Sequence, residues 1–167
     1  PLWALESQRP VKEFDMIAFS IGYEMSYSNI VNMLNLAKVP LHAKDRKGLH
    51  NMVFAGGVCT FNPEPLADFV DFFSLGEGEE STVEIVSLYD KAKSEGWSKE
   101  DFLREVAKIE GVYVPSFYEH IYNEDGTLAE IRGGDDVHTK RIVEDLDTAY
   151  WPSDMIVPST EIVHDRA

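Results

Sequence analysis

The sequence predicts an α/β fold: a short parallel sheet with helices on both faces, followed by a helix, a β-hairpin and an extended connector. Two observations support this prediction. Short apolar runs alternate three times with helix-like patterns between residues 14 and 95, an order typical of parallel sheets with crossover helices. The apolar runs are also nearly continuous, as expected for strands that are buried on both faces.

Three strands are predicted from apolar runs that lack helical spacing. They are "FDMIAFSI" at residues 14–21, "NMVFAGG" at 51–57 and "VDFFSLGEG" at 70–78. The opening stretch "PLWAL", residues 1–5, is predicted as a fourth strand. In sheets of this kind, ligands bind outside the carboxyl ends of the strands. The loops that follow the three apolar runs are therefore candidate binding loops.

Helices are predicted between the strands from apolar spacing and from end signals. Residues 26–40 carry apolar side chains at helical spacing, and Pro40 ends the pattern. Asn62 as the N-cap and Pro63 at the first helical position predict a short helix before the third strand.

Further along the chain, Ser81 and Glu84 have the spacing of a capping box, and an apolar helical stripe follows them. Another amphipathic helix is predicted with Ser98 as its cap and Gly111 past its end. Two alternating runs flank "NEDG", whose Asp-Gly pair fits the turn of a β-hairpin.

The composition limits the partners of the chain. It has 15 basic and 30 acidic residues and a net charge of −15, whereas nucleic acids and anionic membranes attract basic surfaces. We therefore expect neither as a partner. No apolar run has membrane-spanning length and no signal peptide is visible, which predicts a cytoplasmic protein. The single cysteine, Cys59, is predicted to be a small buried side chain.

The stretch "GEGEE" combines the two glycines of a strand-to-helix turn with three carboxylates, those of Glu77, Glu79 and Glu80. Carboxylates repel phosphate, and the third glycine of a dinucleotide fingerprint is missing. They suit hydrogen-bond donors instead, such as the hydroxyls or amides of a nucleotide-like or corrinoid ligand. The structural alternative is that the acids only stabilise the first turn of a helix through its dipole.

The other polar residues predict no catalytic or metal site. The five histidines are scattered without metal-binding spacing, and Ser20 lacks the G-x-S-x-G elbow of a hydrolase. The basic segment at residues 42–50 is predicted to be a solvated loop, with contact to an anionic ligand as the alternative. Three aspartates are predicted to be solvated or to cap helices: Asp15, Asp68 and Asp71.

A longer series of motifs resembles a known family. The stretch "MVFAGGVCTFNPEPLADFVDFFSLGEGEE" has a Gly-Gly turn after one strand, a Pro-Glu-Pro helix start, and a D…GEGE series around the next strand. This series resembles the N-terminal, cobalamin-binding-like region of radical SAM proteins. The stretches "LESQRPVKEFDMIAFSIGYEMSYSNIVNML" and "IEGVYVPSFYE" are similar to an uncharacterised radical SAM subfamily with much longer chains.

The resemblance implies a Rossmann-like (flavodoxin-like) three-layer domain at residues 1–110, a β-hairpin extension at 111–147 and a linker at 148–167. The linker would lead to a partial barrel that holds a [4Fe–4S] cluster and S-adenosylmethionine. It also implies a cleft for a cobalamin-like or nucleotide-like ligand at the strand ends. The implied cofactor-binding residues are Ser20, Gly56, Gly57, Gly76, Glu77, Gly78 and Glu79.

The sequence departs from the family pattern in three ways. The CxxxCxxC motif is absent, and one cysteine cannot hold a cluster that needs three thiolates. The D-x-H-x-x-G motif is absent, so a bound cobalamin would lack a histidine ligand from this chain. The first strand and helix of the family's sheet are expected upstream of Pro1, which would leave a sheet edge exposed and predicts a homodimer.

These arguments predict an accessory domain of a radical SAM Fe–S oxidoreductase that has no catalysis of its own. Its predicted partner is the radical SAM barrel of the same full-length chain. The alternative is an interaction module that binds no cofactor and docks the barrel or a macromolecular substrate, with the aromatic side chains of the hairpin as its surface. A third interpretation, a free-standing flavodoxin-like protein that binds a flavin or nucleotide, is disfavoured by the acidic loop.

Overall fold

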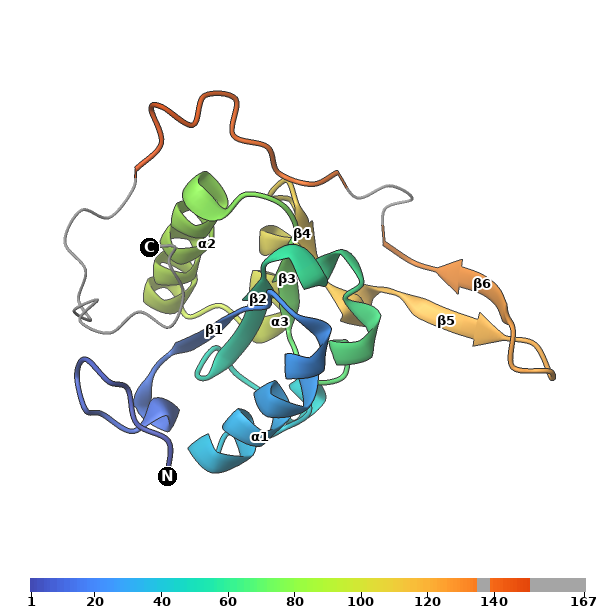
Figure 1. The fold of residues 1–167 in the computed structure, drawn as a ribbon, viewed down its shortest axis with the longest axis horizontal. Helices are drawn as coiled ribbons and strands as arrows, with labels where there is room; N and C mark the ends of the chain where they lie inside the picture. Colours follow the sequence, from blue (N-terminus) through green and yellow to red (C-terminus); the bar gives the residue numbers. More distant parts are fainter. Residues whose placement is uncertain (135–138, 151–167) are drawn as a thin grey trace.

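The structure is a computed structural model that describes residues 1–134 and 139–150. Its main sheet has four strands in the order β1-β2-β3-β4 (Figure 1). The first three are parallel, and β4 is antiparallel to β3. The strands are β1 Met16–Ser20, β2 Met52–Gly56, β3 Phe72–Ser74 and β4 Val112–Tyr113.

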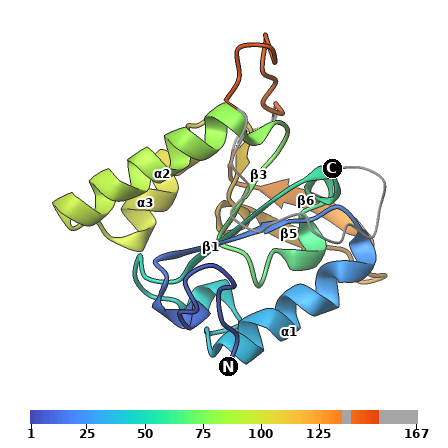
Figure 2. The ribbon, with the colours of Figure 1, turned by 60° about the vertical axis from the view of Figure 1, so that its left-hand side comes forward.

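Helices cover both faces of this sheet (Figure 2). Helix α1, Tyr27–Ala37, lies on one face, and the helices α2, Gly78–Glu95, and α3, Lys99–Val106, lie on the other. This arrangement confirms the predicted α/β fold. The helices and the sheet form three layers, consistent with the Rossmann or flavodoxin-like class. Short 3₁₀ helices fill the connections: Val11–Glu13, Glu24–Ser26, Ala43–Asp45, Val58–Phe61, Glu64–Leu66 and Pro115–Phe117.

The core has two halves because side chains of a strand alternate between the faces of the sheet. On β2, Val53 and Ala55 pack in the half that also contains the apolar face of α1. Met52 and Phe54 pack in the other half, against α2 and α3. Both β2 and β3 are buried almost throughout, which explains their continuous apolar sequences.

Several predicted helix signals are confirmed. The Ser98 side chain caps α3 by accepting a hydrogen bond from the backbone N–H of Asp101, at 3.1 Å. Helix α1 ends at Ala37, three residues before Pro40. Its C-cap, Lys38, takes the left-handed conformation that ends many helices.

Three local predictions are wrong. The stretch "PLWAL" forms no strand, because Trp3 makes only an isolated bridge to Pro10 and the backbone N–H of Leu2 binds α1 at the Leu36 carbonyl. Asn62 caps no α-helix, since the chain there forms two 3₁₀ turns. The capping box at Ser81 is also absent, because α2 begins three residues earlier, at Gly78.

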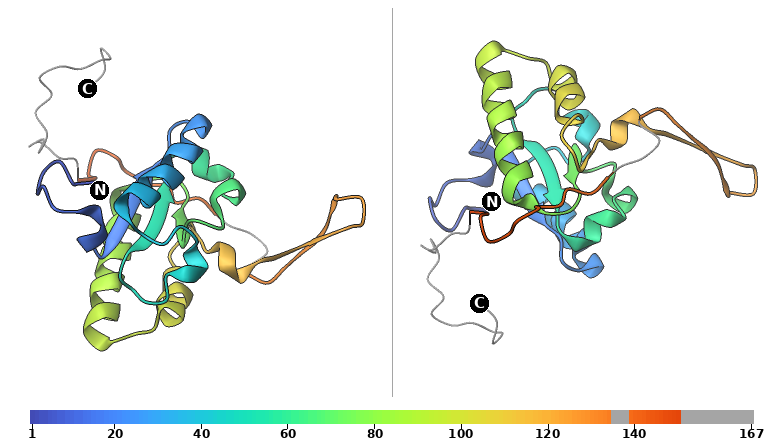
Figure 3. Two further views of the ribbon diagram at one scale, coloured as in Figure 1. Left: turned by 90° about the horizontal axis from the view of Figure 1, so that it is seen from below. Right: turned by 90° about the horizontal axis from the view of Figure 1, so that it is seen from above.

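The hairpin is confirmed. Strands β5, Glu119–Tyr122, and β6, Leu128–Arg132, are antiparallel and project from the body of the domain (Figures 1 and 3). The turn between them is closed by a hydrogen bond from the Gly126 N–H to the Asn123 carbonyl. The residues just before the hairpin, Val112–Tyr113, belong to the main sheet.

The connector after the hairpin is described only for residues 139–150. This segment passes over the start of α2 (Figures 1 and 2). The predicted linker at 148–167 lies mainly outside the described residues.

The outer edge of β1 has no strand partner among the residues that the structure describes. A homodimer through this edge stays a prediction, and sedimentation velocity tests it: a monomer at all concentrations would contradict it. Among the described helices, none is long and apolar enough to cross a bilayer.

Candidate functional site

The loops that follow β1 and β2 are joined at the carboxyl edge of the sheet. The backbone N–H of Ile21 donates to the Gly56 carbonyl at 2.7 Å, and the N–H of Cys59 donates to the Ile21 carbonyl at 3.0 Å. The Tyr27 hydroxyl also donates to the Cys59 carbonyl, at 3.2 Å. The structure therefore brings Ser20, Gly56 and Gly57 together, as the sequence predicts.

Gly57 is required by contact within the chain itself. Its φ angle is +97°, and a Cβ built there would lie 2.7 Å from the Ile21 carbonyl oxygen. A side chain would therefore collide with backbone that cannot move away without breaking the joined loops. The glycine at this position is thus explained by the close approach of the Ile21 backbone.

The loop after β3 is covered by the connector, which we call the strap and define as residues 139–143. The Arg141 N–H donates to the Leu75 carbonyl at 2.9 Å, and the Glu77 N–H donates to the Arg141 carbonyl at 3.0 Å. Gly76 has a φ of +99°, and a Cβ on it would overlap the Arg141 backbone. The glycine thus makes room for the strap.

Two of the three carboxylates of "GEGEE", those of Glu77 and Glu80, bind the strap, and so does Glu84 further along α2. The Arg141 guanidinium contacts Glu80 at 2.6 Å and Glu84 at 2.9 Å, and the Glu77 carboxylate accepts a hydrogen bond from the Val143 N–H. The hydrogen bond to Glu80, followed by the attraction of Glu84, raises the pKa of Arg141. The negative charge of this loop at the N-terminus of α2 is thus partly neutralised by Arg141. Glu79 has no ion pair within the described residues.

The same edge presents four exposed apolar side chains, which we call the edge patch. Tyr23 and Met25 belong to the loop after β1, and Val58 and Phe61 to the loop after β2. Each is at least 60% exposed. The hydrogen bonds of Ile21 described above join these two loops, and groups of exposed large apolar side chains mark binding surfaces. Sequence reasoning missed this patch, although its signal is present as apolar residues in "GYEMS" and "GGVCTF" directly after the strands.

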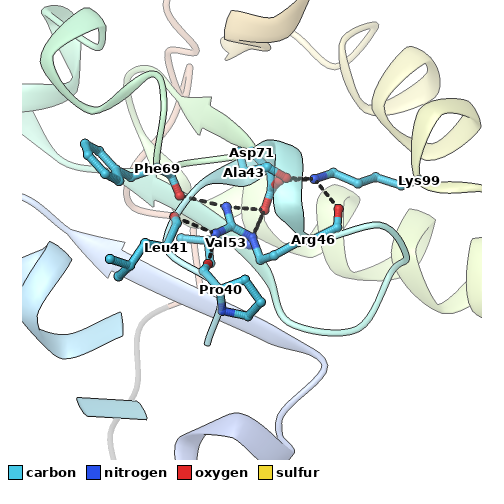
Figure 4. A network of polar contacts seen from close by, with 8 residues as sticks. All are labelled: Pro40, Leu41, Ala43, Arg46, Val53, Phe69, Asp71 and Lys99. Atoms are coloured by element: carbon cyan, nitrogen blue, oxygen red, sulfur yellow. Dashed lines mark hydrogen bonds and ion pairs between the residues drawn. The ribbon is translucent and has the colours of Figure 1, made fainter. Parts of the chain in front are cut away.

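A buried ionic network lies at the opposite end of β3 (Figure 4). Asp71 and Arg46 pair at 3.0 Å with side chains that are almost fully buried, and Lys99 binds the other carboxylate oxygen. The Val53 N–H also donates to Asp71, at 2.7 Å. The predictions of a solvated Asp71 and a fully solvated basic loop are therefore wrong.

The remaining donors of Arg46 bind backbone carbonyls of Pro40, Leu41 and Phe69, and Lys99 binds those of Ala43 and Arg46. The network thus ties the 40–46 loop to β3 and α3. Since all its strong donors are used within the chain, its chemistry is structural.

The family model described as "Radical SAM proteins, N-terminal" matches residues 1–115. The chain belongs to this family. The match covers the whole main sheet and ends before β5, so the hairpin and the strap lie outside it.

One curated relative of this radical SAM N-terminal domain is an uncharacterized protein of Methanocaldococcus jannaschii. It is 36% identical over 85 residues, which are 49% of this chain and 17% of the relative. The matched part thus spans less than a fifth of that relative's length. No solved structure matches the chain.

One thiol is too few for a [4Fe–4S] cluster that takes three thiolates from a chain. The sequence has one thiol, and Cys59 is buried. Burial raises the pKa of the Cys59 thiol, and the nearby Glu24 carboxylate adds to this effect. The described residues contain no cluster of three metal-binding side chains. No histidine occurs in the three strand-end loops to serve as an axial ligand of cobalamin.

Proposed function

We propose that this chain is the accessory N-terminal domain of a radical SAM Fe–S oxidoreductase and that it acts as an interaction module rather than as a catalyst. The observation that supports this best is the edge patch. It lies on the carboxyl edge, where α/β domains bind their ligands. The loop glycines there are explained by contacts within the chain, which leaves the apolar side chains as the part that faces outward.

The partner in this proposal is the cluster-bearing part of the same full-length protein. That part would hold the [4Fe–4S] cluster and S-adenosylmethionine, which supply radical chemistry in the family. The edge patch would cover one side of that site and shield it from water. Burying apolar surface contributes roughly 25 cal/mol per Å², so four large side chains stabilise the contact appreciably.

Calorimetry of the full-length protein tests the proposal. Tyr23→Ser combined with Phe61→Ser removes half of the edge patch, and Val83→Ser is the control because Val83 is similarly exposed but lies on α2. We expect the double variant to unfold the N-terminal domain in a separate transition, several degrees below the rest, and the control to keep one coupled transition. Identical curves for the wild type and both variants would contradict the proposal.

A cobalamin-like or nucleotide-like ligand at the same edge is the second candidate function. The exposed Ser20 beside the edge patch favours it, since a large ligand with both apolar and polar faces would meet both. Gly76 and Glu77 would take part only after the strap moves, because the Arg141 backbone lies against them, whereas Gly78 and Glu79 are exposed. Equilibrium dialysis of the full-length protein against hydroxocobalamin tests this candidate, and retention that is lost in Phe61→Ser would support it.

A further inference from the structure

The hairpin is amphipathic, and its apolar face is uncovered. Residues that pair across antiparallel strands share a face, so the pairs His120–Ile131 and Tyr122–Leu128 lie on one side. Tyr122, Leu128 and Ile131 are each about half exposed or more. We call these four residues the ribbon face. The other side of the hairpin is more polar, with Glu119 opposite Arg132 and an ion pair from Arg132 to Glu130.

In the described part of the chain, the hairpin contacts the body near its base. Gly133 lies against the Phe117 carbonyl and Gly134 against the Tyr118 ring, so closely that neither position has room for a side chain. Beyond this base the two strands project outward (Figure 3). A two-stranded ribbon alone is marginal in water. Its exposed apolar face is therefore expected to pack on another surface.

A groove of about 860 Å³ adjoins the ribbon face. His120 belongs to both, since it lines the groove and lies on the apolar side of the hairpin. Aromatic and aliphatic side chains form much of the remaining wall, among them Phe69, Leu103 and Phe117. Groove and ribbon face thus form one continuous surface, which is larger than a small ligand needs.

The groove contains two lysines without an ion pair in the described residues, and their positive charges favour an acidic partner. Lys44 and Lys47 line it, and neither has an ion pair within the described part of the chain. The groove carboxylates are mostly engaged: Glu64 accepts from the Tyr113 hydroxyl and faces His120 at 3.6 Å, and Glu100 pairs with Arg104. Asp68 is the one groove carboxylate without a side-chain partner in the described residues.

We propose that the groove and the ribbon face together dock the catalytic part of the same polypeptide, through a segment that carries apolar side chains and at least one carboxylate. This inference rests on the proposed function and adds a second contact outside the family match. A partner tethered in the same chain has a millimolar effective concentration. Even a small interface of low intrinsic affinity is therefore occupied. A two-fold dimer through this surface would instead bring the Lys44 and Lys47 of two copies into the same interface. Their like charges would repel, which disfavours a second copy as the partner.

Photo-crosslinking in the full-length protein tests this. A benzophenone side chain replaces Tyr122 on the ribbon face, and Glu119 on the opposite face is the matched control. We expect the probe at 122 to link within one chain to a peptide beyond residue 167, with at least fivefold higher yield than the probe at 119. Links only to residues 1–150, links between chains, or equal yields at both positions would overturn the proposal.

Charge reversal tests the chemistry of the partner. Lys44→Glu with Lys47→Glu is expected to lower the yield from the probe at 122 several-fold and to leave a probe at Phe61 unaffected. An unchanged yield would overturn the acidic partner. The probe at Phe61 also separates the two proposals: if it links to the catalytic part while the probe at 122 does not, the docking by the hairpin fails and the proposed function stands.

Discussion

The Asp71 side chain joins the elements that meet at the amino end of β3. Its carboxylate pairs with Arg46, binds Lys99 and accepts the Val53 N–H of the neighbouring strand. Buried charges are tolerated only when such partners replace water. Removal of one member leaves the others charged, buried and unpaired, which costs more than the pair itself contributes.

Asp71→Asn is therefore expected to lower the free energy of unfolding by about 3–5 kcal/mol. Lys99→Met is the matched control, because Lys99 is partly exposed and its loss leaves the Arg46 pair intact; we expect less than half of that cost. Urea denaturation of the 167-residue chain measures both. Equal effects of the two substitutions would contradict a network centred on the aspartate.

The buried phenol of Tyr89 makes the free energy of unfolding depend on pH in the alkaline range. Burial raises the pKa of Tyr89 to about 12 from 10.0, with smaller contributions from Asp15 and Asp90. The unfolded chain therefore releases this proton near pH 10 while the folded chain keeps it. The stabilisation is complete below pH 10 and is lost as the pH rises toward 12.

Tyr89→Phe should remove this dependence. We expect the free energy of unfolding to fall less steeply between pH 10 and 12, by about 1.4 kcal/mol per pH unit. At neutral pH the variant loses the hydrogen bond to the Leu49 carbonyl and about 1 kcal/mol. Chemical denaturation at several pH values provides the comparison, and parallel pH profiles for both proteins would exclude this role of Tyr89.

At the scale of elements, the strap is held to the end of β3 by backbone pairing and by an arginine. The Arg141 backbone forms hydrogen bonds with the residues on both sides of Gly76, and the Arg141 guanidinium binds two carboxylates in the first turns of α2. The acids of the "GEGEE" loop are thus neither a phosphate cradle nor only a dipole effect. Two of them, Glu77 and Glu80, hold the strap.

Gly76→Ala should release the strap. Gly96→Ala is the control, since both glycines have positive φ but only Gly76 has backbone in the space of a Cβ. We expect a loss of about 1 kcal/mol for the control, a larger loss for Gly76→Ala, and at least tenfold faster hydrogen exchange at the Arg141 amide in that variant alone. Unchanged exchange at Arg141 would show that the strap is not held by this loop.

At the scale of the molecule, the two proposals depend on two groups of exposed side chains, the edge patch and the ribbon face. The buried ionic network around Asp71, by contrast, is used within the chain. This contrast supports the proposed interaction module. A cytoplasmic location stays a prediction from the sequence.

The [4Fe–4S] cluster that we propose for the full-length protein should not depend on this domain's thiol. Cys59→Ala is expected to leave the iron and acid-labile sulfide content per chain unchanged, because Cys59 is buried in the core and burial disfavours its thiolate. Iron analysis after anaerobic reconstitution measures this. A clear loss of iron in a folded variant would place Cys59 among the cluster ligands.

The sequence by itself determined the three parallel strands, the helices α1, α2 and α3, the cap at Ser98 and the hairpin turn. These depend on periodicity, caps and turn residues, which act over a few neighbouring positions. The family was identified from the resemblance of a longer series of motifs. Only the tertiary structure decided the partners of Asp71 and of "GEGEE". Arg46 lies 25 residues from Asp71 and Arg141 lies 61 residues from Glu80, and no local pattern specifies contacts at such separations. The tertiary structure also showed which groups lie against Gly57 and Gly76 at the strand ends: the backbone of Ile21 and of Arg141.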